Sequence, residues 1–138
     1  MITTETQRNR GIIEIKPSDP RTEPIIAAGI EVHRHLGPGL FESIYEECLC
    51  RELELRAIPF RRQIDLPVVY KGLHLPCGYR LDLLVNGEVV VELKAVEVLL
   101  PAHSAQLMTY MRLLDKRIGL ILNFNVPLLR DGIVRKIL

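Results

Sequence analysis

The chain has 138 residues, of which 48% are hydrophobic and 25% charged, which is the size and composition of one soluble globular domain. The 18 basic and 17 acidic residues leave a net charge of +1, so the overall charge neither favours nor excludes nucleic acid as a partner. The polar N-terminus, together with the lack of any apolar run near the roughly 20 residues of a membrane helix, favours a cytoplasmic protein with no membrane contact.

The chain begins with a stretch of little periodicity, residues 1–21, and we expect it to be a flexible lead-in. From Glu23 onward, apolar residues recur at helical spacing. The Gly-Pro-Gly sequence at residues 37–39 should end this first helix, because glycine caps helices and proline cannot continue one. His33 and His35 are two positions apart on it and point in different directions, so both are expected to face solvent.

A second helix is predicted over residues 41–56. Its expected core face consists of apolar side chains at helical spacing, namely Phe41, Ile44, Tyr45, Cys48, Leu49 and Leu53. Glu42 lies at the flank of that stripe. The three cysteines of the chain form no C-x-x-C pair, which argues against a zinc site or a disulfide and favours free thiols in a reducing cytosol.

Strand patterns follow the second helix. The predicted strands are residues 58–65, 78–85, 88–96 and 118–124, with residues 133–138 as a candidate for one more. Residues 68–75 are expected to be a turn region around Lys71-Gly72. A third helix should begin at Pro101. Its inward face is predicted to consist of Leu107, Met111 and Leu114. The predicted order is therefore helix, helix, three strands, helix, strand, an α/β fold with a small mixed sheet flanked by helices.

Asn86-Gly87 is a strong hairpin signal between two of these strands. A two-residue turn would place Asp82 and Glu92 on opposite faces of the hairpin. A three-residue turn with Gly87 left-handed in a bulge would pair Asp82 with Val90, so that the apolar positions share one face and the polar positions the other. Because register follows the buried face, we predict the bulged turn.

In that register Asp82, Glu92 and Lys94 project from one face. Two carboxylates about 4 Å apart repel by roughly 4 kcal/mol at an effective dielectric near 20, and a divalent cation would remove the repulsion. Oxygen ligands favour Mg²⁺ or Mn²⁺ over zinc, and Lys94 could orient a water or stabilise charge on a phosphate. The alternative is a solvated strand face with a Glu92–Lys94 salt bridge, and the pattern alone does not decide between them.

The order of the motifs resembles a known family. Asp82, followed by Glu92-x-Lys94 on the adjacent strand and lying between two helices, resembles the PD-(D/E)XK nuclease superfamily, although Leu81 stands where its name has Pro. Residues 39–45 fit G-x-x-E-x-x-Y and resemble the GxxExxY family, a branch of that superfamily. The similarity runs from about residue 22 to the end, and it includes residues 29–39, 79–82, 91–95, 103–106 and 123–125.

The resemblance implies a metal site with Asp82 and Glu92 as ligands and Lys94 as the catalytic residue that orients the base. It also implies that Glu42 is a further acidic ligand from the second helix. Read without the family, Glu42 would be a surface carboxylate.

Gln106 and Tyr110 fit Q-x-x-x-Y, a motif of the RecB-like nucleases of the superfamily, and the resemblance implies that both belong to the site. Spaced four residues apart, they share a helix face, on which His103 also falls. The alternative for Gln106 is a surface amide. For Tyr45 and Tyr110 the alternative is core packing with a hydrogen-bonded hydroxyl.

We therefore expect residues 22–138 to form a PD-(D/E)XK nuclease-like domain that hydrolyses phosphodiester bonds in nucleic acid, DNA above RNA, with Mg²⁺ or Mn²⁺ as cofactor. Two alternatives stay open: a catalytically silent nuclease-like fold that binds nucleic acid or protein, and an interaction domain whose polar strand face is merely hydrated. Retention of Asp82, Glu92 and Lys94 favours the enzyme, whereas the near-neutral charge favours the alternatives. A homodimer is compatible with each.

Overall fold

The computed structural model describes residues 19–76 and 78–138, so most of the predicted lead-in, residues 1–21, lies outside the described residues. The helices are α1 (Glu23–Leu36), α2 (Glu42–Leu55) and α3 (Pro101–Leu113), with a short 3-10 helix η1 (Leu129–Gly132). The strands are β1 (Phe60–Asp65), β2 (Val68–Tyr70), β3 (Leu73–Leu75), β4 (Arg80–Val85), β5 (Val89–Lys94), β6 (Ile118–Asn123) and β7 (Ile133–Ile137). No described helix combines the length and apolar character that crossing a membrane requires.

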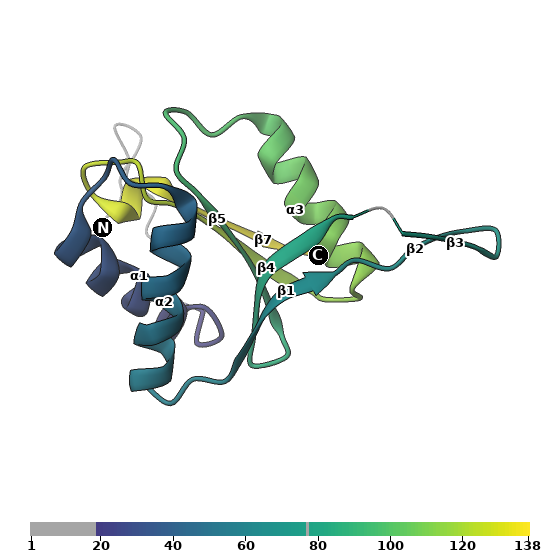
Figure 1. Ribbon diagram of the computed structural model, residues 1–138, viewed down its shortest axis with the longest axis horizontal. Coiled ribbons are helices and arrows are strands. Elements are labelled where there is room, and N and C mark those ends of the chain that lie inside the picture. Colours follow the sequence, from purple (N-terminus) through teal and green to yellow (C-terminus); the bar gives the residue numbers. More distant parts are fainter. Residues whose placement is uncertain (1–18, 77) are drawn as a thin grey trace, which may run out of the picture.

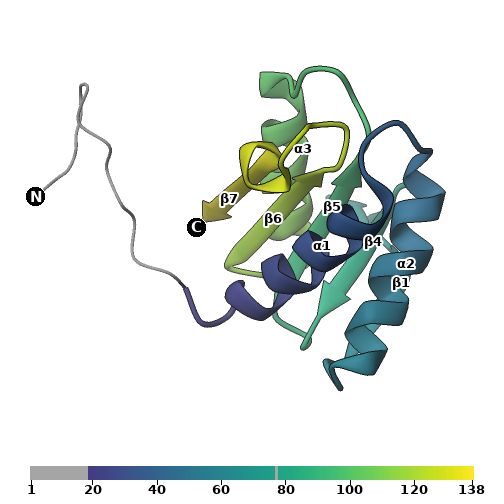
Figure 2. The same cartoon turned by 90° about the vertical axis from the view of Figure 1, so that its left-hand side faces the viewer.

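A five-stranded mixed sheet in the order β1-β4-β5-β6-β7 forms the centre of the fold. β5 and β6 run parallel, and every other neighbouring pair is antiparallel. The parallel pair is joined by α3, which supplies the long crossover that parallel strands require. α1 and α2 cover one face of the sheet and α3 covers the other (Figures 1 and 2). The predicted α/β fold, a small mixed sheet flanked by helices, is therefore confirmed.

Apolar side chains of the β4–β5 hairpin are buried on both faces. Leu83 and Val91 belong to the core beneath α1 and α2, whereas Leu84 and Val90 belong to the core beneath α3. The prediction that a single face would carry all the apolar positions is therefore wrong. The physical reason is that helices cover both faces of this sheet, and a strand buried on both faces is apolar almost throughout.

The face that α2 buries is narrower than predicted. Tyr45, Leu49 and Leu53, spaced four residues apart, are fully buried, but Phe41 is 83% and Ile44 is 44% exposed. Phe41 precedes the first helical residue and has an extended backbone with φ −71° and ψ 152°, so it lies outside the helical stripe. Ile44 lies beside that stripe rather than on it.

The two described cysteines, Cys48 and Cys50, are free, as their spacing predicted. Burial raises the pKa of the Cys50 thiol to about 11, so this side chain stays protonated at neutral pH. The third cysteine, Cys77, lies outside the described residues.

One of the two histidines of α1 is buried, although both were predicted to face solvent. The helix ends before Gly37, which has φ 68°, as predicted. His35 is exposed, but His33 is only 7% exposed, and its Nε2 lies 2.7 Å from the carbonyl oxygen of Val126. His33 also packs near the ring of Phe124. The expected exposure of His33 is wrong because α1 packs against the segment after β6, which lies far away in the sequence.

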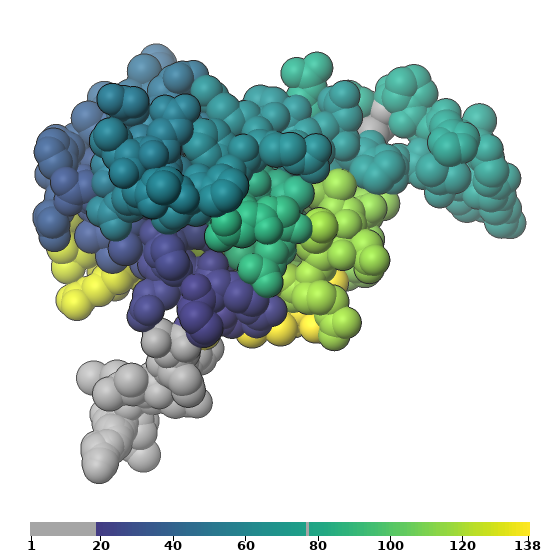
Figure 3. Space-filling model, turned by 90° about the horizontal axis from the view of Figure 1, so that it is seen from below, coloured from purple at the N-terminus to yellow at the C-terminus, as the bar shows by residue number. Residues whose placement is uncertain are grey.

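The stretch predicted as a turn region folds as a hairpin of its own, formed by β2 and β3 and called the arm below (residues 68–75). Lys71 and Gly72 have φ 47° and 86°, as the two central residues of a type I′ turn require. The arm projects away from the rest of the molecule (Figures 1 and 3). The chain leaves and rejoins the sheet at one point, where the Leu66 N–H donates a 3.1 Å hydrogen bond to the Tyr79 carbonyl.

Candidate active site

The turn of the β4–β5 hairpin determines how the candidate residues meet. Asn86 and Gly87 have φ 56° and 63°, and the Glu88 N–H closes the turn onto the Val85 carbonyl at 3.0 Å. Val85 then pairs with Val89, which leaves Glu88 as the extra residue of a bulge. The left-handed conformation predicted for Gly87 is confirmed, but the bulge falls after the turn rather than within it.

The register of the hairpin differs from the prediction. Val90 pairs with Leu84, so the predicted pairing of Val90 with Asp82 is wrong. The observed register brings Glu92 opposite Asp82, a shift of two residues. A shift by two leaves each side chain on its face, whereas a shift by one would have turned it over. Asp82 and Glu92 therefore still meet.

At this point the two carboxylates replace backbone partners in the ladder between the strands. The regular pairing of β4 with β5 reaches only to Leu83 and Val91. One residue further, the Asp82 N–H donates to Glu92 Oε1 at 3.0 Å, and the Leu93 N–H donates to Asp82 Oδ2 at 2.9 Å. Each carboxylate is thus held by the backbone of the opposite strand, and the pair is part of the sheet itself.

The surroundings of the two carboxyl groups raise the pKa of both. Burial, followed by the negative charge of Asp82, raises the pKa of Glu92 to about 8. Burial also raises the pKa of Asp82, with further contributions from the charges of Glu46 and Glu42. The charge of Lys94 lowers both pKa values. Within the described residues, neither Asp82 nor Glu92 forms an ion pair.

Glu42 lies near this pair but does not join it. It is the first residue of α2, it is exposed, and its charge contributes to the raised pKa of both Asp82 and Glu92. Among residues 19–76 and 78–138, no three His, Cys, Asp or Glu side chains lie close enough together to hold a metal ion. The structure therefore brings two of the three predicted ligands into contact and leaves the third beside them.

The buried Tyr45 fixes the loop that precedes Glu42. Its hydroxyl donates to the Gly37 carbonyl at 2.6 Å and accepts from the Leu40 N–H at 3.2 Å. Its ring stacks on Phe124 with centroids 4.5 Å apart. The role weighed as an alternative for Tyr45, core packing with a hydrogen-bonded hydroxyl, is the role it has in the fold, and it sets where α2 begins.

Asn123 holds the segment that follows Lys94. This side chain is 2% exposed; its amide nitrogen donates to the Val96 carbonyl at 2.9 Å, and its oxygen accepts from the Val96 N–H at 3.1 Å. The Phe124 N–H donates to the Lys94 carbonyl at 2.9 Å. The sequence reasoning gave Asn123 no role, although a lone amide at the end of an apolar strand signals a buried partner.

Glu46 is a second acidic residue that the sequence reasoning did not single out. It lies one helical turn after Glu42, and it accepts hydrogen bonds from Arg62 at 3.0 Å and from the Gln63 amide at 3.0 Å. Its charge is one cause of the raised pKa of Asp82. The four-residue spacing from Glu42, which places both carboxylates on one helix face, was the available signal.

On α3, Gln106 and Tyr110 lie one turn apart and line the same cavity, whose volume is about 390 Å³. Tyr79, at the base of the arm, forms another part of its wall. His103 has a different role, because its Nδ1 accepts a 2.9 Å hydrogen bond from the Leu100 N–H and so caps the start of α3.

Residues 19–136 match the family model described as PD-(D/E)XK nuclease superfamily. The match extends from the residues before α1 into β7 and includes every candidate site residue. No curated protein and no solved structure matches the chain.

Proposed function

This chain belongs to the PD-(D/E)XK nuclease superfamily. From this we propose that it hydrolyses phosphodiester bonds in nucleic acid with the help of Mg²⁺ or Mn²⁺, and that its substrate is DNA rather than RNA. One observation carries the proposal. Asp82 and Glu92 face each other across two adjacent strands, both have a raised pKa, and the charge of Lys94 acts on both.

The donor set fits a hard divalent cation. Mg²⁺ is held in proteins by one or two carboxylates, with waters and substrate phosphates completing its octahedron. Asp82 and Glu92 supply two carboxylates, and Glu42 adds negative charge beside them. A third protein ligand in direct contact is therefore not required. A bound cation would supply neutralisation of charge at the phosphate and a water of lowered pKa.

The residues of the chain would do the rest. Asp82 and Glu92 are already held by backbone N–H groups, so they need not reorganise during the reaction. The Lys94 ammonium, whose charge acts on both carboxylates, would donate hydrogen bonds to the attacking water or to a phosphate oxygen. Asn123 fixes the segment after Lys94 and so acts as a positioning residue.

Two finer assignments belong to the same proposal. We place the chain in the GxxExxY branch, supported by the loop before α2, where Gly39 has φ 101° and Tyr45 binds the backbone on either side of it. We also propose that Gln106 and Tyr110 contact the substrate from α3, supported by the cavity that they share.

The test is cleavage of single- and double-stranded DNA and RNA in millimolar Mg²⁺ or Mn²⁺ and in EDTA. Wild type should cleave, and Asp82→Asn should not. Asp115→Asn is the matched control, because Asp115 is exposed and has φ 55°, a conformation that Asn adopts readily. Binding of nucleic acid without cleavage would favour the silent binding module. Light scattering of the same protein would test for a homodimer.

A further inference from the structure

A cavity of about 390 Å³ between α3 and the base of the arm is a candidate binding site apart from the carboxylate pair. The residues that line it are Val68, Tyr79, Gln106, Thr109, Tyr110 and Leu113. None of them is charged, and none belongs to the carboxylate pair. The cavity combines an aromatic wall, apolar side chains and a few polar groups, which is the composition of a small-molecule or cofactor site.

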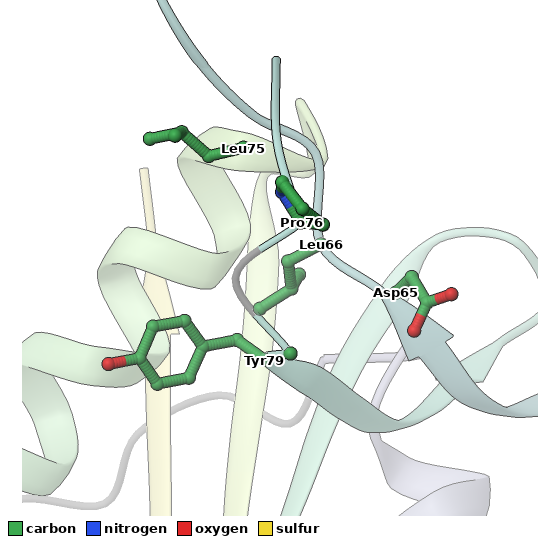
Figure 4. A pocket seen from close by; sticks show the side chains of 6 residues that line it. Asp65, Leu66, Leu75, Pro76 and Tyr79 are labelled. Carbon is green, nitrogen blue, oxygen red and sulfur yellow. The ribbon is translucent and has the colours of Figure 1, made fainter.

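Tyr79 is the unusual member of this lining, because it is an aromatic residue that the fold holds in place without burying. Its side chain is 58% exposed, while its carbonyl is anchored to the Leu66 N–H at 3.1 Å. The ring extends toward α3 and away from Asp65 (Figure 4), and Tyr79 lines both this cavity and a neighbouring one of about 410 Å³. An exposed aromatic ring on an anchored backbone can stack with another planar group.

The polar groups of the lining suit the edge of a planar heterocycle. Gln106 is half-buried, and its amide offers two donors and one acceptor. Arg112 stands at the rim, where its guanidinium donates a 3.3 Å hydrogen bond to the Thr109 hydroxyl, and it forms no ion pair within the described part of the chain. A cation at the rim and a neutral interior match a nucleotide whose phosphate stays outside while its base enters.

The cavity is also within reach of the carboxylate pair. Tyr79 precedes Asp82 by three residues, and β4 connects them, which corresponds to about 10 Å along an extended strand. A nucleic acid strand with one phosphate at Asp82 would need to span about this distance to place a neighbouring nucleotide at Tyr79.

We propose that this cavity binds one unpaired nucleobase of the substrate, stacked on Tyr79 and hydrogen-bonded by Gln106, with Arg112 on an adjoining phosphate. The inference rests on the proposed nuclease function and adds its substrate class, which is nucleic acid with an unpaired base beside the scissile bond.

The experiment measures binding of a labelled single-stranded oligonucleotide by anisotropy, with all proteins in the Lys94→Ala background so that nothing is cleaved. Tyr79→Ala should weaken binding by roughly 5- to 100-fold, the loss associated with one base–aromatic stack, and Tyr79→Trp should restore it. Tyr70→Ala is the matched control, because Tyr70 is 61% exposed but lies on the arm outside this cavity. It should change the affinity less than twofold.

An abasic nucleotide placed in turn at each position of the oligonucleotide locates the base. One position should weaken binding to the Lys94→Ala protein, and the same position should have no further effect with Tyr79→Ala. Equal affinity of the Tyr79→Ala and parent proteins, alongside normal cleavage by wild type, would overturn the cavity inference alone. No binding of any oligonucleotide, together with no cleavage, would overturn the proposed function itself.

Discussion

The raised pKa of Glu92 makes the stability of the metal-free protein depend on pH. Raising the pKa of this carboxyl from its ordinary 4.5 to about 8 corresponds to roughly 5 kcal/mol as an upper limit. Because the folded state holds the proton more tightly than the unfolded chain, the contribution is fully present below pH 4.5. It is lost as the pH rises through 8, with a slope of at most about 1.4 kcal/mol per pH unit.

The assay is urea denaturation in EDTA between pH 5 and pH 9, on wild type and on Glu92→Gln. Gln keeps an oxygen that can accept from the Asp82 N–H, but it does not titrate. The free energy of unfolding of the Glu92→Gln protein should therefore fall less steeply between pH 5 and pH 9 than that of wild type. With millimolar Mn²⁺, wild type should instead gain stability as the pH rises, because ligands must be deprotonated to bind metal. Parallel curves for wild type and Glu92→Gln in EDTA would refute the reasoning, since they would mean that Glu92 is already ionised in the folded protein.

Three further changes test other parts of the site. Lys94→Ala should abolish cleavage while Mn²⁺ binding, measured by calorimetry, stays roughly intact; equal activity would remove Lys94 from the mechanism. Asp82→Ala should lose metal binding, and it should unfold about 1–3 kcal/mol more easily than Asp82→Asn, because it leaves a backbone N–H of β5 without its acceptor; equal denaturation midpoints would contradict this. Tyr45→Phe should cost about 1–2 kcal/mol for its two lost hydrogen bonds and reduce activity through Glu42, and an unchanged melting temperature would contradict it.

Elements specified by short stretches of sequence could be predicted. The first helix ends where the Gly-Pro-Gly sequence at residues 37–39 predicted, and the hairpin at Asn86-Gly87 forms where expected. The same kind of signal at Lys71-Gly72 was read only as a turn, because three-residue strands are too short to show periodicity. The register of the larger hairpin was wrong by two residues, since the pattern shows that a bulge is needed but does not show that Glu88 supplies it.

The candidate site could be predicted only where it depends on a short stretch of sequence. Asp82 and Glu92 lie on one hairpin, so alternation and register suffice to bring them together. The position of Glu42 depends on how α2 packs on the sheet, which only the family resemblance indicated. Asn123 and His33 find their partners 27 and 93 residues away, and no local pattern encodes such contacts.

The hydrogen bond that closes the base of the arm has a consequence for how this protein can change. Because the Leu66 N–H and the Tyr79 carbonyl hold the two ends of the excursion together, the sheet does not depend on the length of what lies between them. Insertions and deletions are tolerated where few other contacts are lost, so the arm can change in length and sequence while the five-stranded sheet stays the same. Changes in the arm would alter the surface beside the cavity, whereas the two carboxylates would keep their geometry. Substrate preference could therefore change without a change in the catalytic site.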